Sequence, residues 1–112
     1  MLRFSLISAA AALALAAAVP VAAQDAGSCN YTMKNAFAGP YKVCSAPMSA
    51  DDCTARGSEN DNSDAAHADA GCSAETVVGA CSVGDVKTVY YEGDAGGLEI
   101  GCGFQGGTWS KE

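Results

Sequence analysis

The side chains best suited to chemistry lie in one acidic stretch near the middle of the chain. It contains four carboxylates and the only histidine, namely Glu59, Asp61, Asp64, His67 and Asp69. Carboxylates at alternating positions are typical of Ca²⁺ loops, and an imidazole beside a carboxylate can bind a transition metal. The stretch lacks the glycine of an EF-hand loop, however, and a single imidazole gives little affinity. We predict a solvated connector without a cofactor, and keep weak binding of a divalent cation as an alternative.

Few side chains in the sequence could support catalysis. A nucleophilic triad requires a base beside a serine, threonine or cysteine, and His67 lies in the connector. Glu92, Asp94 and Glu99 could supply paired carboxylates for glycoside hydrolysis, but so small a domain offers little cleft to exclude water. We therefore predict that the protein is not an enzyme, and we assign no catalytic residue.

The first residues predict export. Arg3 precedes a run from Leu6 to Val19 that is apolar apart from Ser8, and small residues follow up to Ala23. This is the layout of a secretory signal peptide, so we expect residues 1–23 to be removed. Residues 24–112 would then form one periplasmic or extracellular domain. The net charge of −7 argues against nucleic acid and anionic membranes as partners, since both attract clustered lysine or arginine.

Six cysteines lie in the exported part, and no two of them have the C-x2-C spacing of a zinc site. They are Cys29, Cys44, Cys53, Cys72, Cys81 and Cys102. An even number of cysteines behind an export signal predicts a disulfide framework. Such bonds, worth roughly 2 to 4 kcal/mol each, would compensate for a core with few bulky aliphatic side chains.

The second half of the chain has the clearer local structure. "TVVGACSV" and "VKTVYYE" are β-rich runs, and Gly84-Asp85 between them suits a tight hairpin turn. A two-residue turn would place Val83 opposite Val86. Asp94 can cap a following helix, which would extend through Cys102 and end at the glycines that follow.

The first half is similar in outline. "CNYTM" and "YKVCS" predict a strand pair, and Ser49 with Asp52 resembles a capping box for a short helix that ends at Gly57. "CTARG" repeats the Cys-x3-Gly spacing of "CGFQG", so residues 29–57 and 72–109 read as two imperfect repeats. Between them, residues 58–71 predict an exposed connector with one short helix that begins near Ser63.

The sequence therefore predicts an α+β fold, a small disulfide-rich domain with short β-hairpins and short helices. Packing of the second helix on its hairpin would join Cys81 to Cys102. By analogy we expect Cys44 with Cys53, which leaves Cys29 with Cys72 to join the two repeats. Many other pairings remain open.

The second repeat resembles a small cysteine-rich module of exported bacterial proteins of unknown function. The pattern C…VG.C…VYY…C…GGTW is present as Cys72, Val78-Gly79, Cys81, Val89-Tyr90-Tyr91, Cys102 and Gly106-Gly107-Thr108-Trp109. The resemblance implies a secreted, disulfide-stabilised bacterial domain and brings no activity or catalytic residue.

Binding is the function class that we favour, with a structural role beside it. Tyr90, Tyr91, Phe104 and Trp109 could form an aromatic surface for a protein or glycan partner. Alternatively, Trp109 and one tyrosine fill the thin core. We expect a monomer. A protease-inhibitor-like role is a further alternative, because "SAPMSADD", residues 45–52, could form a loop that Pro47 makes rigid.

Overall fold

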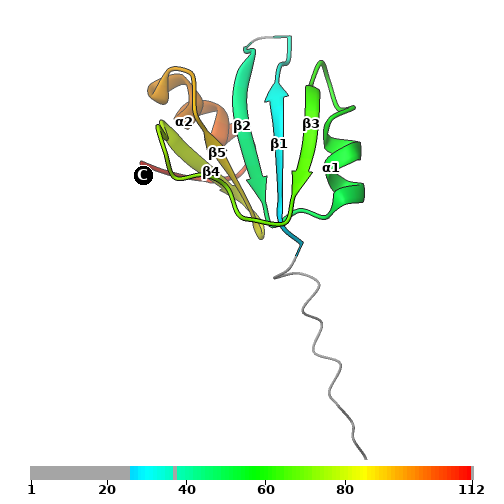
Figure 1. The fold of residues 1–112 in the computed structure, drawn as a ribbon. Helices are drawn as coiled ribbons and strands as arrows, with labels where there is room; N and C mark the ends of the chain where they lie inside the picture. The colour runs from blue at the N-terminus through cyan, green and yellow to red at the C-terminus, as the bar shows by residue number, and fades with distance from the viewer. Residues whose placement is uncertain (1–25, 37, 112) are drawn as a thin grey trace, which may run out of the picture.

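The computed structural model describes residues 26–36 and 38–111, so the predicted signal peptide lies outside the described residues. Within them, six strands form one antiparallel sheet in the order β3-β1-β2-β5-β4-β6, accompanied by two helices (Figure 1). The elements are β1 (Ser28–Met33), β2 (Tyr41–Ala46), α1 (Ala50–Arg56), β3 (Ser63–Ala68), β4 (Gly79–Val83), β5 (Val86–Tyr90), α2 (Ala95–Phe104) and β6 (Thr108–Ser110). The predicted small disulfide-rich α+β fold is confirmed.

Local sequence signals account for the hairpin and both helix starts. Val83 pairs with Val86 across the Gly84-Asp85 turn, as the alternation of apolar residues predicts. The Ser49 side chain accepts a hydrogen bond from the backbone N–H of Asp52 and caps α1. Asp94 caps α2 in the same way, through the backbone N–H of Gly97.

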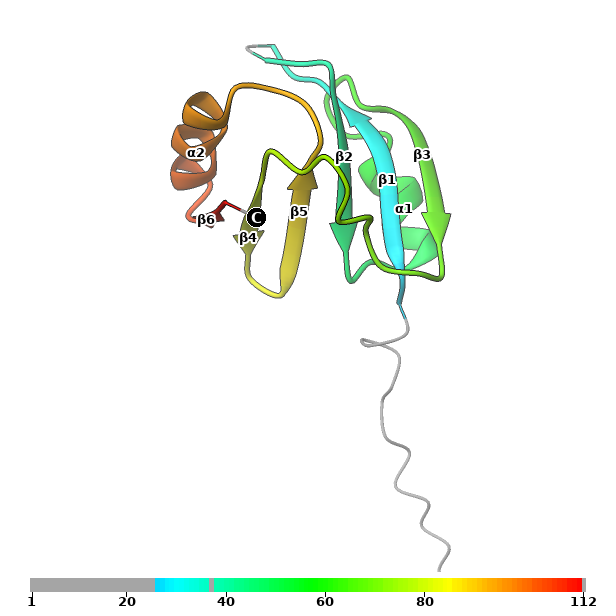
Figure 2. The same ribbon diagram turned by 60° about the vertical axis from the view of Figure 1, so that its left-hand side comes forward.

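Both helices lie on one face of the sheet, which we call the helix-bearing face (Figure 2). Four residues follow one another across β1, β2, β5 and β4 as direct partners and share that face: Cys29, Ser45, Thr88 and Cys81. The first and last of them form disulfides to Cys53 in α1 and Cys102 in α2. Each helix is therefore bonded to the strand beneath it.

The two halves have the same order of elements, strand-strand-helix-strand. In this arrangement β1 corresponds to β4, and Cys29 corresponds to Cys81. Our alignment of the repeats, which matched Cys29 with Cys72, is therefore wrong. Ser45 corresponds to Thr88, and these two residues also face each other in the sheet, so an approximate twofold axis passes between them.

Two of the three expected disulfide pairings are wrong. Cys81–Cys102 is present as predicted, but Cys29 pairs with Cys53 and Cys44 pairs with Cys72. Successive residues of a strand point to opposite faces. Because Ser45 faces the helices, its neighbour Cys44 points to the other face and cannot reach α1.

The predicted helix in the connector is also wrong, because residues 63–68 form β3. This strand pairs with β1, from Ser28 opposite Ala68 to Thr32 opposite Ser63, with a register shift between. Tertiary pairing here overrides the helix propensity of alanine. The chain then crosses the face opposite the helices, where Cys44–Cys72 and a 2.8 Å hydrogen bond from Tyr91 Oη to the Ser73 carbonyl hold it.

The core lies between the sheet and the two helices. Its cluster contains the two helix-strand disulfides together with Tyr31, Val43, Met48 and Tyr90, all nearly inaccessible to solvent. Partly buried side chains from both halves pack around it, among them Leu98 of α2 and Trp109 of β6. Disulfides thus take up much of the space that aliphatic side chains fill in larger domains.

Candidate functional site

The four aromatic residues proposed from the sequence do not share one surface. Tyr90 is 6% exposed, and the ring of Trp109 packs against it with centroids 5.9 Å apart. Tyr91 lies on the opposite face of the sheet and bonds to Ser73. Phe104 alone is well exposed, at 88%, on α2. Trp109 and Tyr90 are therefore parts of the core, as the alternative interpretation had it.

Burial also sets the acidity of Tyr90. Removal from water, followed by the neighbouring Tyr31 and Tyr41, raises its pKa from 10.0 to about 12. Its hydroxyl donates to Met33 Sδ at 3.6 Å. Tyr90 is thus protonated and structural at neutral pH.

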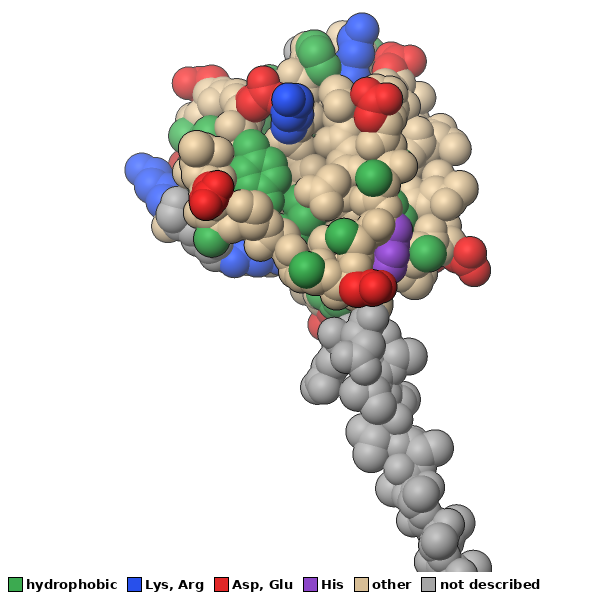
Figure 3. All heavy atoms as spheres, viewed as in Figure 1, with side chains coloured by type: hydrophobic (Ala, Val, Ile, Leu, Met, Phe, Trp, Pro, Cys, Tyr) green, Lys and Arg blue, Asp and Glu red, His purple; other side chains and the backbone are tan. Residues whose placement is uncertain are grey.

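The acidic connector does not assemble a metal site among the described residues, where no group of three His, Cys, Asp or Glu side chains could hold a metal ion. His67, visible in purple in Figure 3, directs Nε2 at the backbone carbonyls of Ala26 and Met48. Two carbonyl acceptors require that this nitrogen carry the proton. His67 therefore holds the start of β1 to the segment before α1.

The segment proposed as an inhibitor loop, residues 45–52, is not a protruding loop. Its first two residues end β2 and its last three begin α1. Between them Met48 is 5% exposed, and its N–H donates to the carbonyl of Gly27. The disulfide expected to brace this segment, Cys44–Cys53, is absent because both cysteines have other partners.

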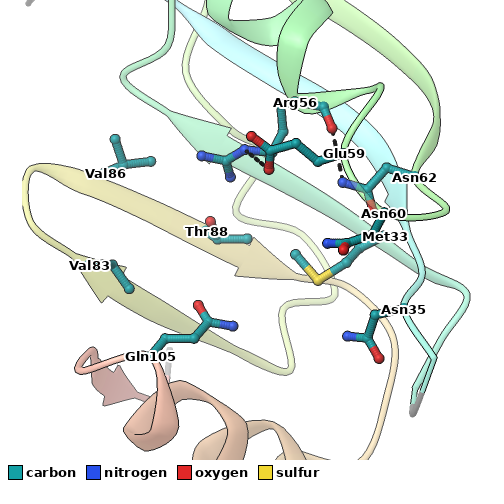
Figure 4. A pocket seen from close by; sticks show the side chains of 10 residues that line it. All are labelled: Met33, Asn35, Arg56, Glu59, Asn60, Asn62, Val83, Val86, Thr88 and Gln105. Atoms are coloured by element: carbon teal, nitrogen blue, oxygen red, sulfur yellow. Dashed lines mark hydrogen bonds and ion pairs between the residues drawn. The ribbon is translucent and has the colours of Figure 1, made fainter.

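A groove lies on the helix-bearing face between the two helices, where neither covers the central strands (Figure 4). Its volume is about 370 Å³, within the range of small-molecule sites. The lining residues are Met33, Asn35, Arg56, Glu59, Asn60, Asn62, Val83, Val86, Thr88 and Gln105. We call this space the inter-helix groove and take it as the candidate functional site.

A chain of hydrogen bonds runs beneath the groove. Arg56 Nη1 donates to Tyr31 Oη at 3.1 Å, Tyr31 Oη lies 3.0 Å from Ser45 Oγ, and Ser45 Oγ lies 2.7 Å from Thr88 Oγ1. Arginine can only donate, so Tyr31 accepts from it. The hydroxyl proton of the buried Tyr31 then forms a hydrogen bond only if it points to Ser45. The hydroxyl proton of Ser45 in turn forms one only if it points to Thr88.

This order leaves one proton over at the end of the chain. Because Ser45 is inaccessible to solvent and Thr88 borders the groove, the less costly order is for Thr88 to accept from Ser45 and to direct its own proton toward the groove. Thr88 is 9% exposed and lines the groove, where Figure 4 shows it between the two walls. A buried hydroxyl group thus presents a hydrogen-bond donor to the groove, and a chain anchored by a cation polarises that donor.

The two walls come from equivalent places in the two halves. Arg56 directly precedes Gly57 at the end of α1, and Gln105 directly precedes Gly106 at the end of α2. On the first wall Arg56 Nε lies 3.4 Å from Glu59 Oε2. Asn62 Nδ2 donates to the Arg56 carbonyl at 2.9 Å and holds this turn in place. The side chain of Gln105 forms no hydrogen bond with the described residues.

One end of the groove is apolar. Val83 and Val86, on either side of the β4-β5 turn, line this end, and Met33 of β1 lies at the opposite end beside Asn35 (Figure 4). A second hollow of about 360 Å³ adjoins it and shares Met33, Asn35 and Gln105. The groove therefore combines an arginine, side-chain amides and a hydroxyl donor with a small aliphatic surface.

The sequence contains a pattern at this site, but the pattern was interpreted as a sign of two repeats and not of a groove. The Cys-x3-Gly echo marks the ends of both helices, and the residue before each glycine is a wall of the groove. Nothing in the spacing shows that β2 and β5 are neighbours, and only that pairing brings Arg56 and Gln105 to one groove.

No protein-family model, curated protein or solved structure matches this chain. The resemblance to the exported cysteine-rich module therefore remains a prediction. In the part of the chain that the structure describes, no helix is long and apolar enough to cross a membrane.

Proposed function

We propose that this protein is an exported, disulfide-stabilised, non-enzymatic binding protein, and that the inter-helix groove is its binding site. The observation that carries the proposal is the Thr88 hydroxyl group, which lines a concave space between two helix ends and has Ser45 Oγ as its hydrogen-bond partner. A hydroxyl group has one proton and two lone pairs, so this group can form a further hydrogen bond with a ligand, and such a bond in a partly dry site gains free energy.

The disulfide framework supports both export and binding. Disulfides persist in oxidising compartments outside the cytoplasm. Cys29–Cys53 and Cys81–Cys102 each fix one helix to the sheet, so the two walls are held in place before a ligand arrives. A preformed site avoids much of the entropy cost of ordering on binding.

Catalysis is not part of the proposal. All six cysteines are in disulfides, and His67 does not line the groove and directs Nε2 at backbone carbonyls. Among the groove residues the charged side chains are Arg56 and Glu59, which pair with each other. These side chains can bind and orient a ligand but offer no nucleophile with a base beside it.

Ligand-observed saturation-transfer NMR tests this proposal with residues 24–112. The mixture should contain neutral disaccharides, capped tripeptides and small dicarboxylic acids. We expect at least one compound to receive saturation from the wild type and not from Val83→Trp, whose indole would fill the apolar end. Ile100→Trp is the control, since Ile100 is 64% exposed on α2 and outside the groove. If no compound binds, or if Val83→Trp binds equally well, the groove is not the site.

A further inference from the structure

We infer that the ligand of the inter-helix groove is an uncharged saccharide of about one or two rings. This inference rests on the proposed binding function and adds the chemical class of the ligand. The groove volume of about 370 Å³ sets the size. The charges, the free hydrogen-bonding groups and the aliphatic end of the groove set the chemistry.

Charge favours a neutral ligand. The guanidinium of Arg56 is already opposed by Glu59, 3.4 Å away, so the groove offers no uncompensated charge among its lining side chains. The whole chain carries a net charge of −7, which repels anions at long range. An anionic ligand would have to displace Glu59, and a cationic ligand would have to displace Arg56.

The free hydrogen-bonding groups suit hydroxyl groups. Thr88 presents a donor at the floor, and the guanidinium of Arg56 has more N–H groups than its bonds to Tyr31 and Glu59 use. Gln105 and Asn60 each add an amide that both donates and accepts, with no bond to the described residues. A sugar hydroxyl also both donates and accepts, so it can pair with each of these groups.

The aliphatic end provides the remaining contact. Val83 and Val86, which pair across the β4-β5 turn, offer a surface against which the C–H face of a pyranose ring can pack. Val83 is 42% exposed without a ligand, which leaves apolar area to be buried on binding.

A peptide is the less suitable ligand. Extended peptides gain affinity mainly by adding a strand to a free sheet edge. The floor of this groove is formed by central strands, since β5 pairs with β2 on one side and with β4 on the other. Their backbone groups are already paired, so a peptide backbone would find only scattered side chains.

Chemical-shift mapping of residues 24–112 labelled with ¹⁵N tests the inference. The probes are cellobiose, maltose, lactose and N,N′-diacetylchitobiose, with the capped peptide acetyl-trialanine-amide in parallel. We expect at least one disaccharide to shift the amides of Val86, Thr88 and Gly106 at millimolar concentration. If the peptide shifts them and no disaccharide does, the ligand class is wrong and the binding function stands. If neither shifts them, both proposals fail.

Variants at Thr88 test the donor itself. Thr88→Val keeps the shape and removes the hydroxyl, and it should weaken binding by about tenfold, the effect of one lost hydrogen bond in a buried site. Thr88→Ser restores the hydroxyl and should bind within about threefold of the wild type. Thr32→Val, on the opposite face of the sheet, is the matched control. Equal binding by Thr88→Val and Thr88→Ser, with both folded, would overturn the role of the hydroxyl.

Discussion

Ser45 and Thr88 face each other at the centre of the sheet, with hydroxyl oxygens 2.7 Å apart. They occupy equivalent positions in the two halves of the chain, so their contact marks the approximate twofold axis of the molecule. The inter-helix groove lies over this contact, and its walls are the equivalent helix ends at Arg56 and Gln105. The groove therefore requires both halves of the chain, because each half supplies one of its walls.

Ser45 should couple the buried hydrogen bonds of both halves. Ser45→Ala leaves the Tyr31 proton without an acceptor and Thr88 without its donor, so we expect a loss of about 1 to 3 kcal/mol in the free energy of unfolding. In a double-mutant cycle, Ser45→Ala combined with Thr88→Val should cost less than the sum of the two single changes. Urea unfolding measures these values, and strict additivity would contradict the hydrogen-bond chain.

Peptide mapping under non-reducing conditions should find Cys29–Cys53, Cys44–Cys72 and Cys81–Cys102. Trypsin with Asp-N separates Cys44 from Cys53, and Glu-C separates Cys72 from Cys81. A peptide that joins Cys44 to Cys53 would show that Cys44 and Ser45 do not point to opposite faces of β2.

Mild reduction should open Cys44–Cys72 first. Cys72 is partly exposed on the crossing segment, whereas the other five cysteines are buried. Exchange requires access of the attacking thiolate, so exposure favours this bond. Alkylation after limited treatment with a thiol reductant, followed by mass spectrometry, should label Cys44 and Cys72 before any other cysteine. Earlier labelling of Cys53 or Cys102 would show that a helix detaches from the sheet.

Two glycine substitutions should change stability in opposite directions. A Cβ at Gly79 would overlap the indole ring of Trp109, so Gly79→Ala should cost about 1 to 3 kcal/mol in the free energy of unfolding. Nothing lies near a Cβ at Gly101 in α2, so Gly101→Ala should gain up to about 1 kcal/mol from helix propensity. Thermal unfolding of both variants measures this contrast. Equal tolerance at the two positions would mean that Trp109 does not pack on β4.

Stability should fall in strongly alkaline solution because of Tyr90. Its pKa is about 12 in the folded protein and close to 10 when unfolded, so the unfolded state releases the proton first. The stabilisation is fully present below pH 10 and is lost as the pH rises toward 12. Tyr90→Phe should show a shallower decline over this interval in urea unfolding. The same slope in both proteins would contradict the burial of the Tyr90 hydroxyl.

The sequence predicted the elements whose signals are local. The turn at Gly84-Asp85 and the caps at Ser49 and Asp94 depend on a few neighbouring residues, and all three are confirmed. The strand at Ser63–Ala68 was missed because its alanines favour a helix, and only its pairing with β1 decides otherwise. Pairing between strands that are far apart in the sequence is hard to predict from the composition of either strand.

The disulfide errors have a geometric origin. We aligned the repeats by counting cysteines, which matched Cys44 with Cys81. The structure matches Cys81 with Cys29 instead, because Cys44 and Ser45 point to opposite faces of β2. The groove escaped prediction for the same reason, since it depends on the order of six strands and on no motif of its own.

The most direct measurement is of contacts between a bound disaccharide and individual methyl groups of the protein. Isotope-filtered NOE spectra, with methyl-labelled protein and the strongest binder of the shift mapping, report protons within about 5 Å in space, a distance similar to that of packed apolar groups. We expect NOEs to the methyls of Met33, Val83, Val86 and Thr88, which line the groove. NOEs to Ile100 on the outer side of α2 instead, or to none of these groove methyls, would contradict the assignment of the groove as the binding site.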